Sequence, residues 1–325
     1  MELNDFLAEW HNDNPRILVH TSGSTGKPKP LMVEKRRMLN SARITCDFLG
    51  LKPGDTALLC MPLDYIAGKM MVVRSLQRDL RLTSVRPSSH PLADDALPHF
   101  TFAAMVPMQV YNTLKVPCER ERLMRIRHLI IGGGAISDEL AQMIKPLPNA
   151  VWSTYGMTET LSHIALRRLN GPDASLWYTP FDGVGISLNA DGCLVIDAPE
   201  VCAEPLVTND IAQLRTDDRT GKTLFRIKGR KDNVVCSGGI KIQIEEVEET
   251  LRPHLSAPFM IVKKQDEMLG EKAILLTEST DLTHIEEICR NTLPKYWVPR
   301  EFLHIDHLPL TETGKPKRTL PLTPR

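Results

Sequence analysis

Residues 21–29 read Thr-Ser-Gly-Ser-Thr-Gly-Lys-Pro-Lys. These nine positions combine four hydroxyl side chains, two glycines and two lysines. Glycine lets backbone N–H groups converge on a ligand, and such convergent groups suit an anion, above all phosphate. The preceding residues 16–20, Arg-Ile-Leu-Val-His, have the apolar pattern of a short buried strand. The segment therefore predicts a phosphate-binding loop that follows a strand.

The loop does not fit the Walker A pattern G-x-x-x-x-G-K-[ST] of kinases and GTPases. Gly23 and Gly26 are too close together for that pattern. Pro28 occupies the position of the magnesium-binding Ser or Thr, and it disfavours helical backbone at Lys27. A flexible Ser/Gly linker is the alternative, although linkers seldom follow a buried-strand pattern so closely.

Composition bounds the class of protein. The 325 residues suffice for two domains, and 42% hydrophobic with 25% charged residues is ordinary for a globular chain. The net charge of zero gives no basic footprint for nucleic acid. No apolar run has membrane-spanning length, and the first residues lack the profile of a secretion signal. Seven dispersed cysteines without a CxxC pair favour reduced thiols, and hence a cytoplasmic protein.

Strands alternate with helices over the first half of the chain. Apolar residues at helical spacing over residues 3–10 predict an opening helix, and a second helix is predicted over residues 34–49, ending at Gly50. Ser137 is expected to cap a further helix. Short apolar runs predict strands at residues 57–61, 101–105, 129–131 and 151–154. This alternation predicts a layered α/β core.

Beyond residue 180 the pattern changes to short strands, at residues 194–196, 206–208 and 224–227, with a hairpin turn at Asp191-Gly192. The polar run at residues 229–232 marks the predicted boundary. We expect an N-terminal domain over residues 1–229, a hinge at 230–232 and a C-terminal domain over 233–325. That C-terminal domain should contain a helix over 245–255, paired strands at 259–263 and 273–277, and a helix that begins with a Thr283–Glu286 capping box.

The loop at 21–29 resembles the phosphate loop of the AMP-forming acyl- and aryl-CoA ligases, the adenylate-forming superfamily. Residues 155–160, Tyr-Gly-Met-Thr-Glu-Thr, are similar to its second signature. A carboxylate at a strand end can hold Mg²⁺ together with phosphates. The resemblance implies that Tyr155 lies against adenine, that Thr158 meets phosphate and that Glu159 binds Mg²⁺.

Three further segments resemble superfamily motifs in the same order. Gly133-Gly134-Ala135 corresponds to the backbone that lines the adenine pocket, although many strand–helix turns contain glycines. Thr208-Asn209-Asp210 replaces the usual Thr-Gly-Asp, with Asp210 expected on the ribose hydroxyls. Asn209 departs from the usual glycine, but asparagine tolerates left-handed backbone. Residues 229–232 resemble the hinge segment, with Arg230 implied for ribose and Asp232 as the hinge residue.

The C-terminal motifs complete the resemblance. Gly238 and Gly239 match the tunnel for the pantetheine arm of coenzyme A, and a tight turn is the simpler explanation of the pair. Residues 311–318 match the catalytic-lysine motif, with Lys315 as the cation that stabilises charge on the attacking carboxylate and the α-phosphate. A solvated basic tail is the alternative. The implied nucleotide-binding residues are Thr21, Ser22, Gly23, Ser24, Thr25, Gly26, Lys27, Gly133, Gly134, Ala135, Tyr155, Gly156, Asp210 and Arg230.

The acid-binding residues are less explicit. Tyr65 stands in a segment that lines the acid pocket in relatives, although a core tyrosine is the alternative. Ser162 and His163 are candidate polar contacts. A basic residue that meets a second carboxylate would be one of Lys69, Arg74 and Arg167.

The compact chain, with Asn170-Gly171 and the run at residues 191–199, resembles short bacterial o-succinylbenzoate–CoA ligases of menaquinone synthesis, and the resemblance covers nearly the whole chain. The resemblance implies a shortened, layered N-terminal adenylate-binding domain and a small mobile α+β C-terminal domain. It also implies an aromatic dicarboxylic acid, ATP, Mg²⁺ and coenzyme A as reactants and cofactors. Three alternatives stay open: another aryl- or acyl-CoA ligase, an adenylation domain that loads a carrier protein, and a nucleotide-binding regulator without catalysis.

The early position of the phosphate loop leads to a further expectation. Only one predicted helix and one strand precede it, whereas most members of the superfamily have a substantial subdomain there. We therefore expect an acid pocket that lacks one wall. Whether a second subunit of a homo-oligomer, a rearranged loop or solvent fills the gap is left open.

Overall fold

The computed structural model describes residues 1–20, 30–134, 136–310 and 317–318. The predicted phosphate loop at 21–29, Ala135 and Lys315 lie outside the described residues. The chain divides into two compact units. The first comprises Met1–Ser187, Val195–Leu206 and Leu214–Arg226, and the second comprises Leu188–Leu194, Val207–Gln213 and Ile227–Arg325. The predicted boundary at residues 230–232 stays a prediction.

A seven-stranded sheet forms the centre of the first unit, in the order β4-β3-β5-β6-β7-β8-β9. Its strands are β3 (Thr56–Leu59), β4 (Arg81–Ser84), β5 (Phe102–Met105), β6 (His128–Ile131), β7 (Ala150–Gly156), β8 (His163–Arg168) and β9 (Thr179–Pro180). Neighbours from β4 to β7 are parallel, whereas β8 and β9 pair antiparallel. Every residue of β5 is buried, as a strand covered on both faces requires. The predicted α/β fold class is confirmed.

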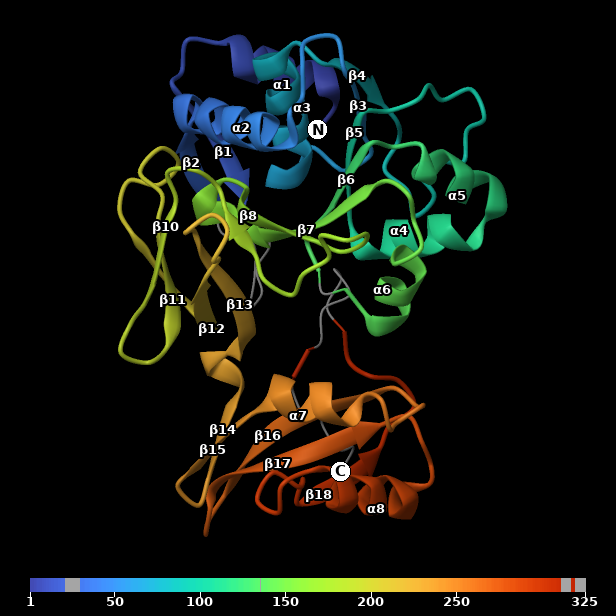
Figure 1. Ribbon diagram of the computed structural model, residues 1–325, viewed down its shortest axis with the longest axis vertical. Helices are drawn as coiled ribbons and strands as arrows, with labels where there is room; N and C mark the ends of the chain where they lie inside the picture. Colours follow the sequence, from blue (N-terminus) through green and yellow to red (C-terminus); the bar gives the residue numbers. More distant parts are fainter. Residues whose placement is uncertain (21–29, 135, 311–316, 319–325) are drawn as a thin grey trace. The chain divides into compact units, whose positions relative to one another are not determined.

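In the part of the first unit that the structure describes, six α-helices accompany this sheet, together with a small antiparallel pair of strands (Figure 1). The helices are α1 (Leu3–His11), α2 (Lys35–Leu49), α3 (Ile66–Arg78), α4 (Pro107–Lys115), α5 (Pro117–Met124) and α6 (Asp138–Ile144), and the pair is β1 (Arg16–His20) with β2 (Pro30–Glu34). Helix α2 packs against α3, and α4 packs against α5 and α6. As predicted, α2 ends at Gly50 in left-handed backbone, and the Ser137 side chain caps α6 by accepting from the Leu140 N–H.

A second sheet has the order β10-β11-β12-β13. Its strands are β10 (Gly185–Leu188), β11 (Cys193–Asp197), β12 (Leu206–Thr216) and β13 (Thr223–Arg230). The predicted hairpin turn at Asp191-Gly192 joins β10 to β11. The Asn189 side chain stabilises it by accepting from the N–H groups of Asp191 and Cys193 at 3.0 and 2.9 Å. The division into two units passes through this sheet.

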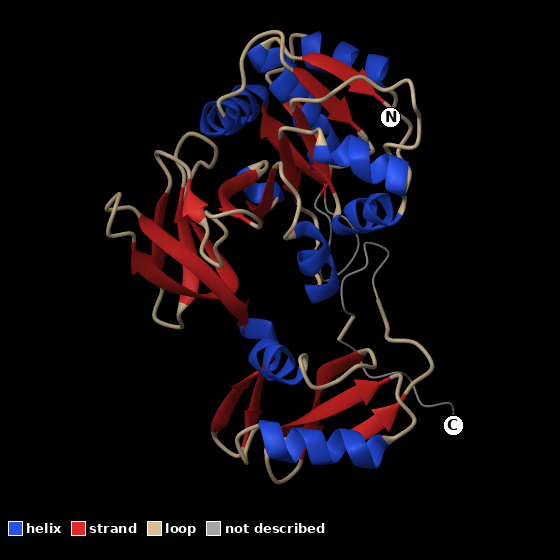
Figure 2. Ribbon diagram, turned by 45° about the vertical axis from the view of Figure 1, so that its right-hand side comes forward, coloured by secondary structure: helices blue, strands red, loops and turns tan. Residues whose placement is uncertain are grey.

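The second unit contains a five-stranded sheet in the order β15-β14-β17-β16, with β18 beside β17 (Figure 2). Its elements are β14 (Val234–Ser237), β15 (Ile240–Gln243), α7 (Ile244–Leu251), β16 (Phe259–Asp266), β17 (Gly270–Thr277), α8 (Leu282–Thr292) and β18 (Glu301–His304). The predicted strand pair has the register Phe259↔Thr277 to Lys263↔Ala273. Two helix boundaries in this unit, the end of α7 and the start of α8, differ from expectation. Helix α7 ends at Leu251, and α8 is capped by Asp281, whose carboxylate accepts from the His284 N–H, rather than by the Thr283–Glu286 pair.

Alternating side chains of β16 and β17 reach two apolar clusters in this unit. Ile261 and Leu275 belong to the larger cluster, which α7 and α8 complete with residues such as Val247 and Ile285. The smaller cluster consists of Met260, Val262, Ile274 and Leu276. Because neighbouring residues of a strand point to opposite faces, the two clusters lie on opposite faces of the sheet.

A buried ion pair joins the end of the described chain to this unit. The Arg318 guanidinium donates to both carboxylate oxygens of Glu248 in α7 and to the Ile261 carbonyl of β16. The Arg318 and Glu248 side chains are only 15% and 10% exposed. The Lys317 N–H also donates to the Pro309 carbonyl at 2.8 Å. Bidentate geometry and the extra carbonyl contact offset the cost of removing these charges from water.

His128 at the start of β6 predicts a loss of stability in acid. Neither ring nitrogen has a hydrogen-bond partner among the described residues. Burial, with smaller contributions from Arg127 and Arg168, lowers the pKa of His128 to about 4. The unfolded chain therefore binds a proton at His128 as the pH falls below about 6.5, whereas the folded chain binds it only near pH 4. The free energy of unfolding consequently decreases as the pH falls from about 6.5 to about 4.

We expect His128→Gln to reduce that decrease by on the order of 1 kcal/mol, because the partly exposed ring realises only a fraction of the full linkage energy. Thermal unfolding of the wild type and the variant at pH 7.5 and pH 5 measures the difference. Equal pH dependence in the two proteins would contradict this role for His128.

Candidate active site

The predicted signature at residues 155–160 folds back onto the start of β8. A register shift between Tyr155 and Gly156 pairs Tyr155 with Ala165 but Gly156 with His163. A Cβ atom on Gly156 would lie 2.2 Å from the Ser162 carbonyl oxygen and 2.4 Å from the His163 Cα atom. Only glycine fits this approach without a backbone shift, so Gly156 fixes where Ser162 and His163 lie.

Thr160 holds the turn between the two strands. Its fully buried hydroxyl accepts from the Met157 N–H at 2.9 Å and lies 2.9 and 2.6 Å from the carbonyl oxygens of Met157 and Ser162. The next residue, Leu161, is buried with φ of 64°, which a leucine rarely adopts. Such strain persists only where neighbouring contacts over-determine it, and strained residues of this kind cluster at functional sites.

The three signature residues with predicted roles have different surroundings. Tyr155 is partly buried, with its ring 5.0 Å from that of Phe225 and 5.7 Å from that of Tyr178. Thr158 is buried in a short 3₁₀ turn, Thr158–Thr160. Glu159 is exposed, and its carboxylate has no hydrogen-bond or ion-pair partner among the described residues. An exposed carboxylate of this kind fits the oxygen-ligand preference of Mg²⁺.

Ser162 and His163 belong to a polar chain that connects α2, β8 and α3. The Arg74 guanidinium donates to the Ser162 hydroxyl at 2.5 Å, and that hydroxyl lies 3.1 Å from His163 Nδ1. His163 Nε2 lies 3.2 Å from the Thr45 hydroxyl, which donates to the Ser41 carbonyl at 3.0 Å. The structure therefore brings two of the three predicted acid-binding residues, Ser162 and His163, together with one of the three candidate cations.

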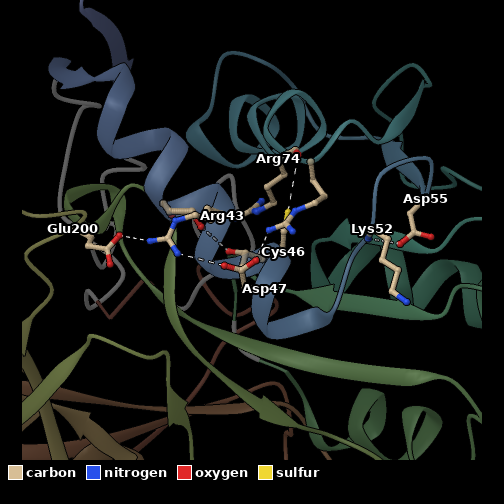
Figure 3. A network of polar contacts seen from close by, with 10 residues as sticks. Arg43, Cys46, Asp47, Lys52, Asp55, Arg74 and Glu200 are labelled. Carbon is tan, nitrogen blue, oxygen red and sulfur yellow. Dashed lines mark hydrogen bonds and ion pairs between the residues drawn. The ribbon is translucent and has the colours of Figure 1, made fainter.

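Arg74 is a cation without an acidic partner. Its side chain is 2% exposed, and no carboxylate of the described residues lies within 4 Å of it. Its Nε atom has no hydrogen-bond partner there either. Burial lowers the pKa of Arg74 to about 10, so the guanidinium keeps its charge at neutral pH. Figure 3 shows Arg74 close to Cys46 of α2.

The other two candidate cations have different partners. Lys69 is buried and donates to the Leu18 carbonyl at 3.1 Å. Arg167 donates to the Ser175 carbonyl at 3.2 Å and lies over the Tyr178 ring. Of the three, only Arg74 reaches the side chain of a predicted acid-binding residue with its charged group in the described part of the chain; Lys69 contacts Tyr65 through its backbone N–H alone.

A small hollow of about 10 Å³, little more than the space of one water molecule, lies next to the polar chain, with His163 in its wall. Much of the rest of its wall is apolar, from Ile44, Ile164, Phe181 and Val184. The His163 and Phe181 rings meet edge to face with centroids 5.5 Å apart. Tyr65, the remaining predicted acid-binding residue, is 45% exposed where α3 begins.

The predicted ribose-binding residues come together in the second unit. Arg230 Nη1 lies 3.5 Å from Asp210 Oδ1, and Arg230 Nη2 donates to Asp232 at 3.0 Å. The Asn209 amide donates to the same Asp232 oxygen at 3.3 Å. The structure thus places two carboxylates and a guanidinium side by side, although the residues are some twenty positions apart in sequence.

The remaining predicted glycines occupy turns. Gly133 and Gly134 follow β6, and Gly133 has a φ of +80°. Gly238 and Gly239 form the two-residue turn between β14 and β15, both with positive φ, as a type I′ hairpin requires. Turn geometry therefore accounts for the second glycine pair, and its role toward coenzyme A stays a prediction.

Sequence reasoning missed Thr45. It lies inside α2, where its hydroxyl donates back to the carbonyl four residues earlier, and no local pattern distinguishes it from other helical threonines. The ion pairs around it were also missed: Arg43 contacts Asp47 and Glu200 (Figure 3), and Arg78 contacts Asp47. Arg43 and Asp47 lie four residues apart within α2, whereas only the packing of α2 against α3 and the turn near Glu200 brings Arg78 and Glu200 to them.

Comparison with known proteins shows the family to which the chain belongs. Residues 4–203 match the family described as AMP-binding enzyme. A solved acyl-CoA synthetase (AMP-forming)/AMP-acid ligase II-like protein from Dyadobacter fermentans is 34% identical, with a TM-score of 0.67, and the match covers 97% of this chain and 91% of that one. The chain belongs to the AMP-binding enzyme family.

Two other relatives are longer. The 2-succinylbenzoate–CoA ligase of Bacillus mycoides is 25% identical, over 94% of this chain and 69% of that protein. The o-succinylbenzoate coenzyme A synthetase of Bacillus subtilis, solved with ATP and a magnesium ion, is 23% identical with a TM-score of 0.72, over 93% of this chain and 68% of that one. These likenesses agree with the α/β fold and the AMP-forming ligase class. No helix in the described residues has the length and apolar character to span a membrane.

We expect Gly156→Ala to disrupt this site, because the added methyl group must displace the Ser162 carbonyl. Overpacking of this kind costs about 1–3 kcal/mol or more. Thermal unfolding measures the loss, and Gly185→Ala in β10 is the control, because a Cβ atom there would meet Asp197 at an ordinary 3.5 Å. A Gly156→Ala protein as stable as the wild type would contradict the close approach.

Proposed function

We propose that this protein is an ATP-dependent acid–CoA ligase that forms an acyl-adenylate and then a CoA thioester, with o-succinylbenzoate as its acid. The observation that carries the choice of acid is the buried Arg74 beside Ser162, without a carboxylate from the described chain. Relatives named 2-succinylbenzoate–CoA ligase support the same choice.

The argument for a dicarboxylic acid is electrostatic. Removing a guanidinium from water costs several kcal/mol unless an anion or well-placed acceptors compensate. The described protein offers Arg74 one hydroxyl, from Ser162, and a distant methionine sulfur. A substrate carboxylate would supply the missing negative charge and two acceptor oxygens in the planar geometry that arginine matches. A monocarboxylic acid, whose only carboxylate must react, would leave Arg74 unpaired.

The roles in nucleotide binding follow the resemblance, residue by residue. We assign Thr21, Ser22, Gly23, Ser24, Thr25, Gly26 and Lys27 to the β- and γ-phosphates, Tyr155, Gly133, Gly134 and Ala135 to adenine, and Asp210 and Arg230 to ribose. Thr158 would contact phosphate. Glu159 would hold Mg²⁺, which offsets phosphate charge when bound, as the magnesium- and ATP-bound Bacillus subtilis relative supports.

The proposed reaction has two steps. The acid's carboxylate attacks the α-phosphate of ATP, and pyrophosphate leaves. The thiol of coenzyme A then attacks the acyl carbon, and AMP leaves. Lys315 would stabilise the charge of the first step, Asp232 would be the hinge between the steps, and Gly238 and Gly239 would border the thiol arm. Menaquinone biosynthesis in the cytoplasm is the proposed setting, in keeping with seven cysteines that form no disulfide.

An acid panel tests the substrate. With o-succinylbenzoate we expect ATP-dependent pyrophosphate release well above that with benzoate or short fatty acids. Arg74→Met should raise KM for o-succinylbenzoate at least about tenfold, the effect of losing roughly 1.4 kcal/mol of charged hydrogen bonding. Arg78→Met, one helical turn away and paired with Asp47 on the surface, is the matched control and should leave KM unchanged. Equal rates with benzoate, or an unaltered KM in Arg74→Met, would refute the assignment.

The same assay separates the alternatives. Another CoA ligase would release pyrophosphate with a different acid of the panel. A domain that loads a carrier protein would form the adenylate but no thioester with free coenzyme A. A nucleotide-binding regulator would bind ATP and release no pyrophosphate with any acid.

Lys315→Ala tests the division of labour between the two steps. We expect adenylation to slow by about 10²–10³-fold, as for removal of one transition-state donor, while thiolysis of supplied acyl-adenylate continues. Lys317→Ala is the control, because Lys317 is exposed and contributes its backbone N–H to Pro309. Pyrophosphate release and thioester formation are measured separately, and equal loss of both steps would exclude this role.

A further inference from the structure

His163 is the central member of the polar chain Arg74–Ser162–His163–Thr45. It is 7% exposed, and it contacts the hydroxyl of the preceding residue, Ser162, on one side and the Thr45 hydroxyl of α2 on the other. A buried imidazole costs free energy unless both ring nitrogens are satisfied, and here both are. Nothing in the reaction proposed above uses this ring.

The protons of this chain can be placed by elimination. The Ser41 carbonyl can only accept, so the single hydroxyl proton of Thr45 points to it. The Thr45 oxygen then accepts, which makes His163 Nε2 the protonated nitrogen. Nδ1 of a neutral ring is then an acceptor, and it takes the Ser162 hydroxyl proton.

The Ser162 hydroxyl therefore accepts the hydrogen bond from Arg74, because its proton is already donated to His163. The guanidinium can only donate, so its short contact with Ser162 matches this direction. The surroundings keep His163 neutral. Burial, and to a lesser degree the charge of Arg74, hold the pKa of His163 well below its usual range. Among the described residues, Asp182 and Glu200 share the wall of the hollow with His163, and Cys46 lies near Arg74.

We propose that His163 is a positioning residue for the second-carboxylate site: by taking the Ser162 hydroxyl proton it orients Ser162 as an acceptor that holds the Arg74 guanidinium in place. This inference rests on the proposed function, since it concerns how that site recognises a dicarboxylic acid. Thr45 has a supporting part, because it fixes which nitrogen of the ring carries the proton.

A positioning role for His163 predicts different effects on substrate binding and on turnover. The chain acts on the end of the acid that does not react, so its loss should weaken binding of the diacid and leave the turnover of bound substrate nearly unaltered. An acid that lacks the second carboxylate does not use Arg74, so its KM should not depend on His163. KM for ATP should also stay unchanged.

Nuclear magnetic resonance tests the proton placement without reference to any substrate. In protein labelled with ¹⁵N-histidine, the resonances missing from His163→Asn identify His163. We expect a neutral ring protonated on Nε2 from pH 5 to pH 8 in the wild type. A ring protonated on Nδ1, or one that becomes cationic within this range, would overturn the proposal.

Three variants test the positioning role through pyrophosphate release with o-succinylbenzoate and with its two analogues that each lack one carboxylate. His163→Leu removes both polar contacts and should raise KM for the diacid about tenfold, with kcat within about twofold, as expected for a loss of uniform binding. His163→Asn keeps an acceptor near the Nδ1 position and should recover most of the loss. Thr45→Val, nearly isosteric, should give an intermediate KM. Thermal unfolding confirms that each variant is folded.

The outcomes distinguish this inference from the proposed function. A wild type that treats the diacid and the reactive monocarboxylate analogue alike overturns the proposed substrate, and this role with it. A wild type that prefers the diacid, together with a His163→Leu variant that raises KM equally for both acids, overturns the role of His163 alone. Failure of His163→Asn to recover KM would also count against the proposed direction of the Ser162 hydrogen bond.

Discussion

The close approach of Gly156 to the backbone of Ser162 and His163 is the constraint on which the site depends. No side chain fits between β7 and the start of β8 there, so the chain must turn within the Thr158–Thr160 segment. The buried Thr160 hydroxyl satisfies the polar groups of that turn, and Leu161 takes up the strain as left-handed backbone. As a consequence, the Glu159 carboxylate faces solvent while Ser162 and His163 face α2 and α3. One turn thus supplies both the predicted metal ligand and the predicted acid contacts.

A buried charge is the second organising feature. Arg74 lies in α3 among side chains of α2 and β8 that give it a hydroxyl and no carboxylate from the described chain. Two nearby cations do have an acidic partner: Arg43 and Arg78 pair with Asp47 at the surface, where such ion pairs contribute little to stability. The contrast supports a recognition role for Arg74 over a structural one, because a structural arginine in such a place is normally balanced by an acid.

The second unit shows how a segment near the predicted catalytic lysine is anchored. Arg318 stands three residues after Lys315 and pairs with Glu248 of α7, while the Ile261 N–H and carbonyl complete the contacts of the two charges. In the same unit, Asp210, Arg230 and Asp232 form a second charged group, which the proposed function assigns to ribose and to the hinge. Both groups bring together residues far apart in sequence; the Arg318–Glu248 pair balances its charges, whereas Arg230 faces the two carboxylates of Asp210 and Asp232.

The sequence by itself determined the local structure and the family. Residues with strong local signals, such as Gly50 after α2, Ser137 before α6 and the 259–263 and 273–277 strand pair, were predicted correctly because their chemistry acts over a few positions. The Thr283–Glu286 cap was predicted wrongly, since the helix begins two residues earlier, where the Asp281 carboxylate accepts from the His284 N–H. Sequence named Lys69, Arg74 and Arg167 as equal candidates, and only the tertiary structure distinguished them. Which cation meets Ser162, which nitrogen of His163 carries a proton and why Thr45 matters depend on contacts between α2, α3 and β8, and burial and hydrogen-bond direction exist only once those elements are packed.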